Sequence, residues 1–162
     1  MNCVFLDIDG VLNSMPFYEN KSTRELLDHP FDPENVLQLK KIIDATGARI
    51  VLTSSWRGGW DKDPANCTWE GKLLNELFDS IGISVYDKTV VSDKGRAWEI
   101  KEYLRTSPEK IQKYVIIDDN DFEWKKNRLA RHVVLTSFNE GGLKEAHALK
   151  AIDILNRKHF FL

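Results

Sequence analysis

Two carboxylates separated by one residue, Asp7 and Asp9, follow an apolar run at residues 3–6 (CVFL). The run predicts a buried strand, and Gly10 after the acids predicts a turn. Side chains two apart on a strand point to the same side, so we expect Asp7 and Asp9 to converge on one spot. Two like charges that close need a cation, a shared proton or a reaction between them, which makes the pair a candidate catalytic site.

Polar clusters of the same kind follow other apolar runs. Thr53 and Ser54 come after the run RIVL, and Asp118 and Asp119 come after the run YVII. Lys94 stands at the start of a predicted helix. Because ligands of open α/β sheets bind beyond the carboxyl ends of the strands, we expect these groups to share one edge of a sheet.

Strand and helix signals alternate along the chain. Short apolar runs predict strands at residues 3–6, 49–52, 83–86, 114–117 and 132–135. Helical spacing of apolar residues predicts four helices. The first begins at Asp32-Pro33 and runs to Gly47, and the second contains residues 73–78 and stops at Gly82. The third follows a cap at Asp93, and the fourth spans residues 143–152. The alternation predicts an α/β fold, a three-layer Rossmann-like doubly wound parallel sheet.

Length and composition limit the other features. The 162 residues fit one domain over 1–162, and the formal charge of −2 excludes a globally basic surface but not a local basic patch. Cys3 and Cys67 show no framework spacing, which indicates reduced thiols and a cytoplasmic protein. We expect neither a signal peptide nor a membrane span, because acids interrupt the first apolar run. Residues 160–162 (FFL) are expected to dock on the body or on a partner.

The order Asp7/Asp9, Thr53, Lys94, Asp118/Asp119 resembles the haloacid dehalogenase (HAD) superfamily of phosphotransferases, over almost the whole chain. Within it, DIDGVLN, LTSSWR and a late GGL are similar to the small HAD domains associated with RNA repair systems. The polar interval at about residues 14–31 is long enough for a short flap but not for a large cap domain. The resemblance therefore implies a capless HAD-like domain, and capless members tend to act on macromolecules.

The resemblance also implies a role for each group. Asp7 is the expected nucleophile, which forms an aspartyl-phosphate, and Asp9 the expected acid and base. The Thr53 hydroxyl and the Ser54 backbone N–H are expected to bind the phosphoryl group. Lys94 is expected to neutralise Asp7 and the charge on the phosphoryl oxygens.

Magnesium is the implied cofactor. Asp7, Asp118, Asp119 and the backbone carbonyl of Asp9 offer the hard oxygen ligands that Mg²⁺ prefers.

Several assignments around this site stay open. Arg96 and Lys101 compete with Lys94 for the role of the phosphate-site cation. Arg57 is a candidate for holding a second phosphate. The tryptophans of the same stretch, with Lys62 beside them, either stack exposed bases or pack in the core: Trp56, Trp60 and Trp69.

The sequence thus predicts a Mg²⁺-dependent phosphomonoesterase that acts through an aspartyl-phosphate at Asp7. The expected substrate is a phosphorylated nucleic-acid end or a nucleotide, with a phosphoprotein next. Two alternatives from other classes are a phospho-accepting regulatory domain and a non-catalytic binder of phosphorylated ends. The first ranks low, because receiver domains carry the acid pair after the first strand and the phosphorylated Asp after a later one.

Overall fold

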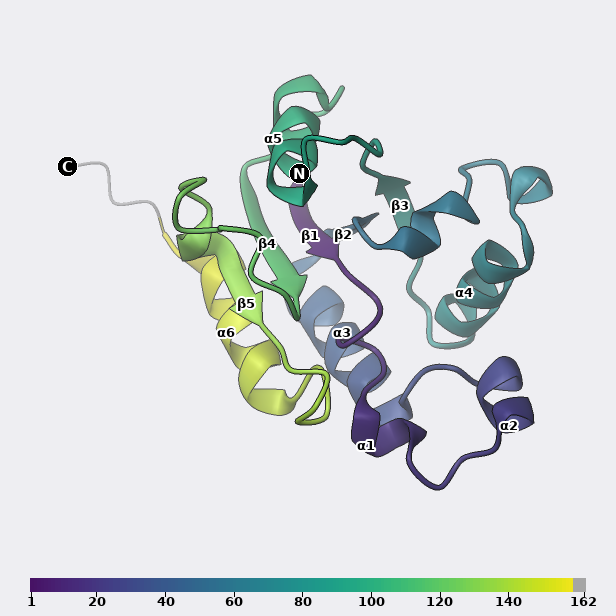
Figure 1. The fold of residues 1–162 in the computed structure, drawn as a ribbon. Helices are drawn as coiled ribbons and strands as arrows, with labels where there is room; N and C mark the ends of the chain where they lie inside the picture. The colour runs from purple at the N-terminus through teal and green to yellow at the C-terminus, as the bar shows by residue number, and fades with distance from the viewer. Residues whose placement is uncertain (159–162) are drawn as a thin grey trace.

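The computed structural model describes residues 1–158, and the predicted docking of residues 160–162 lies outside this range. Five parallel strands form one sheet in the order β3-β2-β1-β4-β5 (Figure 1). The strands are β1 (Asn2–Leu6), β2 (Arg49–Leu52), β3 (Val85–Lys88), β4 (Lys113–Asp118) and β5 (Val133–Leu135). The predicted doubly wound Rossmann-like α/β fold is confirmed, and within residues 1–158 no cap domain interrupts it.

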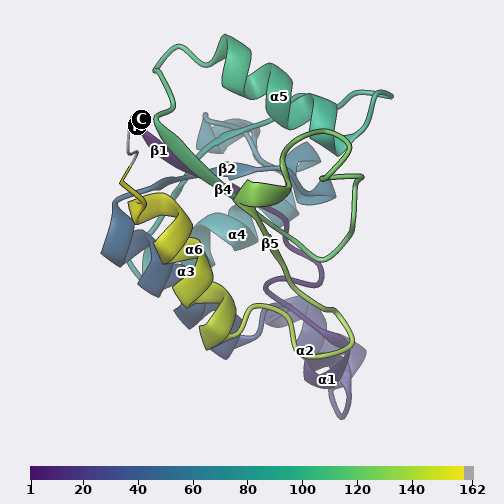
Figure 2. The same ribbon diagram turned by 90° about the vertical axis from the view of Figure 1, so that its left-hand side faces the viewer.

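Helices cover both faces of the sheet. The α-helices are α1 (Met15–Tyr18), α2 (Thr23–Asp28), α3 (Pro33–Thr46), α4 (Trp69–Ser80), α5 (Arg96–Thr106) and α6 (Glu145–Asn156). Short 3₁₀ helices are η1 (Ser55–Gly58), η2 (Pro64–Asn66) and η3 (Ala130–His132). Figure 2 shows α5 on one side of the sheet and the adjacent pair α3 and α6 on the other. No helix among residues 1–158 is both long and apolar enough to cross a membrane.

The central strand β1 alternates between two apolar cores. Val4 and Leu6 are fully buried in the core that α3, α4 and α6 build. Cys3 and Phe5 are fully buried in the core on the opposite face, under α5. Asp7 continues the second series, because side chains on a strand alternate between its faces. The carboxylate that leaves β1 is therefore delivered to the α5 side of the sheet.

The predicted elements are present, with shifts at some ends. Helix α3 has the expected cap, since Asp32 Oδ1 accepts from the Glu34 N–H and Gly47 ends the helix with φ 64°. Strand β3 lies two residues later than predicted, at Val85–Lys88. Helix α5 begins at Arg96 after a Gly95 cap with φ 92°, so Asp93 is not its cap as predicted. Residues 14–31, predicted as a flap, contain the short helices α1 and α2.

Candidate active site

Three carboxylates meet where β1 and β4 end. Oxygen atoms of Asp7, Asp118 and Asp119 all lie within 4.8 Å of one another. Asp7 is 5% exposed and Asp118 is fully buried. The parallel ladder runs one residue past β1, because the Asp7 N–H donates to the Ile117 carbonyl (3.0 Å). Adjacent strands thus bring together acids that are more than a hundred residues apart in the sequence.

The cluster carries more negative charge than its surroundings compensate. Burial and, after it, the charge of Asp118 raise the pKa of Asp7 from 3.8 to about 8, although Arg96 acts in the opposite direction. Burial also raises the pKa of Asp118, again against the lowering effect of Arg96. A divalent cation would relieve this excess, and carboxylate oxygens are the ligands that Mg²⁺ prefers. Asp7, Asp118 and Asp119 therefore fit a magnesium site.

Arg96 is the cation that the structure places against this cluster. Its Nη1 lies 2.7 Å from Asp118 Oδ2 and 3.2 Å from Asp7 Oδ1, and its guanidinium lies over the Phe122 ring at 4.6 Å. The expected cation, Lys94, is exposed, and its Nζ lies 4.5 Å from the centre of the Trp98 ring.

The start of α5 explains why Arg96 takes the place expected of Lys94. Gly95 caps the helix with φ 92°, and α5 begins with Arg96 as its first residue. Lys94 lies before this turn, outside the helix. Lys101, the other alternative, is exposed on α5. The structure thus favours the alternative Arg96 over Lys94 as the positive charge beside Asp7.

Thr53 and Ser54 lie buried beside this cluster, after β2. The Thr53 N–H donates to the Leu6 carbonyl (3.0 Å), which places Thr53 next to the end of β1. Thr53 is fully buried, and among the described residues its Oγ1 has no hydrogen-bond partner. The Ser54 hydroxyl accepts from the Trp56 N–H (3.2 Å) and caps η1, which leaves the Ser54 backbone N–H as its candidate phosphoryl donor. A buried hydroxyl without a partner is costly unless a ligand completes it.

Asp9 lies apart from the three clustered acids, contrary to the expected convergence with Asp7. Strand β1 ends at Leu6, and the chain turns where the Leu12 N–H donates to the Ile8 carbonyl (2.8 Å). The alternation of a strand therefore does not extend to Asp9, which is exposed while Asp7 is buried. The Asp9 side chain is not part of the predicted metal cluster, but its exposure leaves it open to a substrate.

Two residues outside the predicted site fix the turn after Asp9. Asn13 donates from Nδ2 to Asp9 Oδ1 and accepts from the Gly10 N–H, both at 2.8 Å. The Thr136 hydroxyl donates to the Gly10 carbonyl (2.7 Å). Asn13 has a signal in the sequence, as the last residue of DIDGVLN, whereas Thr136 reaches the turn only through the fold.

A comparison with known families agrees with this geometry. The family model described as "HAD domain in Swiss Army Knife RNA repair proteins" matches residues 3–148. The chain belongs to this family. No curated protein and no solved structure matches the chain significantly. The predicted resemblance to small capless HAD domains of RNA repair is thus confirmed, and the cluster of Asp7, Asp118 and Asp119 is consistent with the acidic metal site of a HAD domain.

Arg57 has an internal place in this HAD domain, which does not suit the expected contact with a second phosphate. Its side chain is 8% exposed. Nη1 donates to the Thr53 carbonyl (2.6 Å) and to the Thr89 hydroxyl (2.9 Å), and Nη2 donates to Glu99 Oε2 (2.9 Å). Arg57 therefore braces the loop that carries Thr53.

The tryptophans of the same stretch divide between core and surface. Trp60 is 4% exposed and donates to Asn75 Oδ1 (3.0 Å), so it packs in the core. Trp56 packs with Phe31 and Trp69, at ring distances of 5.1 and 6.2 Å. Trp69 is 58% exposed and is the most exposed of the three.

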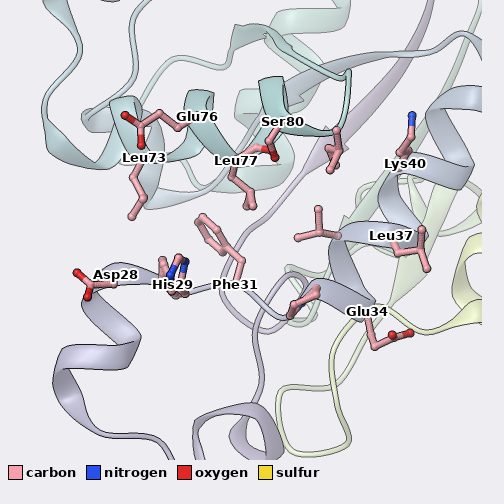
Figure 3. Close-up of a pocket in the computed structure, with 14 residues that line it drawn as sticks. Asp28, His29, Phe31, Glu34, Leu37, Lys40, Leu73, Glu76, Leu77 and Ser80 are labelled. Atoms are coloured by element: carbon pink, nitrogen blue, oxygen red, sulfur yellow. The ribbon is translucent and has the colours of Figure 1, made fainter.

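The HAD domain also has a groove of about 620 Å³ between α4 and the start of α3 (Figure 3). Figure 3 shows Phe31 pointing from the chain before α3 towards Leu77 of α4. None of Asp7, Asp118 and Asp119 lines this groove. The groove is therefore a separate feature, and Phe31, which lines it, packs against Trp56 of the loop after β2.

Proposed function

We propose that this HAD domain is a Mg²⁺-dependent phosphomonoesterase that acts on a phosphorylated nucleic-acid end. The observation that carries the proposal is the cluster of Asp7, Asp118 and Asp119, the first two of them buried, together with the unpartnered buried hydroxyl of Thr53. A charged cluster short of cations, with a buried donor that lacks an acceptor, suits a phosphoryl group and its metal ion. The match to HAD domains of RNA repair proteins supports the nucleic-acid end.

The reaction would proceed in two displacements at phosphorus. In the first, an Asp7 oxygen forms a bond to phosphorus while the bond from phosphorus to the leaving oxygen breaks, and Asp9 gives that oxygen a proton. In the second, Asp9 takes a proton from water, the water oxygen bonds to phosphorus, and the bond to Asp7 breaks. Inorganic phosphate leaves, Asp9 has regained the proton with which it started, and Asp7 is again a free carboxylate.

The different exposure of Asp7 and Asp9 suits their different proposed roles, nucleophile and acid-base. Asp7 is 5% exposed and faces Arg96, so it is shielded from water, whereas Asp9 is exposed and held by Asn13. An exposed acid can exchange protons with a leaving group and then with water.

The remaining groups would stabilise charge. Thr53 Oγ1 and the Ser54 N–H would donate to phosphoryl oxygens, and Arg96 would oppose the charge that builds up on them. Asp7, Asp118 and Asp119 would hold Mg²⁺, with the Asp9 carbonyl as a further expected ligand, and the ion supplies positive charge at the phosphoryl oxygens.

The proposal is tested by phosphate release with Mg²⁺ from a panel of substrates. The panel contains an aryl phosphate, mononucleotides, 3′- and 5′-phosphorylated oligonucleotides, and phosphopeptides. We expect turnover of a phosphorylated oligonucleotide, and a loss on the order of 10³-fold or more in Asp7→Asn, because the nucleophile is removed. The matched control is Asp79→Asn, an exposed acid of α4, which should keep full activity.

Two results would contradict the proposal. Turnover retained in Asp7→Asn would exclude an aspartyl-phosphate at that residue. Tight binding of phosphorylated ends by the wild-type protein without release of phosphate would instead indicate a non-catalytic binder.

A further inference from the structure

Two aromatic side chains from distant segments meet beside the turn that carries Asp9. Tyr18 of α1 and Phe138 of the loop between β5 and α6 pack edge to face, with ring centres 5.9 Å apart. The Met15 N–H donates to the Phe138 carbonyl (2.8 Å), which joins the start of α1 to the same loop. Figures 1 and 2 both show this loop and α1 side by side.

Both segments are anchored to the turn at Gly10. Asn13, which binds Asp9 and Gly10, directly precedes the cap of α1. Thr136, which binds the Gly10 carbonyl, lies two residues before Phe138. The positions of both aromatic rings are therefore set relative to Asp9 by short, hydrogen-bonded stretches of chain.

Tyr18 lies within electrostatic reach of Asp9 and is only partly buried. Burial, and after it the negative charge of Asp9, raise the pKa of Tyr18 to about 12. Within residues 1–158, no hydrogen bond to the Tyr18 hydroxyl is formed, and Phe17 flanks the ring at 5.9 Å between ring centres. Lys21 adds a positive charge here, with its Nζ over the Phe17 ring at 4.8 Å.

We propose that Tyr18 and Phe138, flanked by Phe17, form a leaving-group subsite that stacks the base of the phosphorylated terminal nucleoside. This inference rests on the proposed function. If Asp9 protonates the leaving oxygen, the group attached to that oxygen must lie on the side of Asp9, where these rings are. Bases stack on aromatic side chains with little regard to sequence, so the subsite would read the presence of a base rather than its identity.

The test compares phosphorylated oligonucleotides that carry or lack the terminal base. Wild-type kcat/KM is measured with Mg²⁺ on 3′- and 5′-phosphorylated RNA, and on the same RNA with an abasic terminal nucleoside. We expect a preference for the base of about 5-fold or more at one of the two ends, as stacking provides. Tyr18→Leu should remove this preference, and Tyr18→Phe should keep it because the ring remains.

The matched control is Trp69→Leu, which removes an aromatic side chain outside the proposed subsite. Trp69 is 58% exposed and packs against Trp56. It should leave the preference for the base unchanged. A merely structural effect of Tyr18→Leu would lower kcat/KM equally for both substrates, so the ratio isolates the contact with the base.

The outcomes separate this inference from the function beneath it. Release of phosphate from oligonucleotides with no preference for the base, or with a preference that Tyr18→Leu does not alter, overturns the subsite and leaves the phosphatase intact. Higher kcat/KM on phosphopeptides than on either oligonucleotide also overturns the subsite. No release from any substrate overturns the proposed function, and the subsite with it.

Discussion

The guanidinium of Arg57 lies 2.9 Å from the carboxylate of Glu99, and this buried ion pair joins the loop after β2 to α5. The side chains are 8% and 4% exposed. The other Glu99 oxygen accepts from the Ser92 N–H (2.8 Å), while Arg57 also donates to the carbonyl of Thr53. Since α5 begins at Arg96, the pair ties the loop that carries Thr53 to the helix whose first residue binds Asp7.

Removing either partner of this pair should strongly destabilise the protein. We expect Arg57→Met and Glu99→Gln each to lower the free energy of unfolding by about 3–5 kcal/mol, because each leaves a buried group without its partner. Urea unfolding measures the change. The control is Arg105→Met, which breaks the exposed pair of Arg105 with Glu102 on the same helix and should cost at most about 1 kcal/mol. Similar small losses for Arg57 and Arg105 would contradict the buried role.

The two candidate cations should respond differently to substitution. Arg96→Met should lower kcat/KM by about 10²- to 10³-fold, because the charge beside Asp7 is lost. Lys94→Met should stay within about two- to threefold of wild type, since Lys94 is exposed and lies over Trp98. The kcat/KM of Arg96→Lys should lie between those of Arg96→Met and Lys94→Met, because an ammonium keeps the charge but lacks the forked donors of a guanidinium. Steady-state kinetics on the preferred substrate measures all three, and a larger loss from Lys94→Met than from Arg96→Met would reverse the assignment.

Gly10 is expected to be indispensable for the metal site. It has φ 81°, and a Cβ placed there would lie 2.0 Å from Asp119 Oδ2. Gly10→Ala should therefore displace Asp119 and weaken Mg²⁺ binding by about 10-fold or more, as measured by calorimetric titration.

The matched control for Gly10 is Gly82→Ala. Gly82 has a similar φ of 77°, but a Cβ there would meet nothing within 4 Å. Both substitutions should cost about 1–2 kcal/mol of stability through the left-handed backbone, and only Gly10→Ala should affect the metal. Equal Mg²⁺ affinity in the two variants would show that Asp119 does not bind the ion.

The metal-free protein should lose stability as the pH rises. The folded pKa of Asp7, about 8, lies above the ordinary value of 3.8, so the folded state binds a proton that the unfolded state releases. The stabilising contribution of this proton is present below the ordinary pKa and is lost as the pH rises through about 8. Asp7→Asn should therefore be more stable than the wild type near pH 8. The stability of Asp7→Asn should still depend partly on pH, because the pKa of Asp118 is also raised.

Urea unfolding with a chelator at about pH 5.5, 7 and 8.5 measures this dependence. Mg²⁺ at a hundred times its Kd should raise the free energy of unfolding of the wild-type protein by about 2.7 kcal/mol, and it should raise that of Asp7→Asn less. A metal-free wild-type protein that is most stable at the highest pH would contradict the raised pKa.

The sequence by itself determined the fold and the acidic part of the site. Apolar runs alternating with helical periods require a parallel sheet covered on both faces, and the carboxyl ends of parallel strands meet at one edge. Asp7, Thr53 and Asp118 each stand at or directly after the end of a run, so their proximity followed from strand registration alone.

The tertiary structure decided the cation, the exposure of Asp9 and the use of Arg57. Lys94 and Arg96 are equivalent in charge and close in sequence, and the backbone turn at Gly95 selects which one faces the carboxylates. Asp9 lies outside the cluster because β1 ends at Leu6. Arg57 points inward because it forms an ion pair with Glu99, which lies more than forty residues later in the sequence, on α5. These outcomes depend on backbone torsions and on partners from distant segments, which local spacing does not encode.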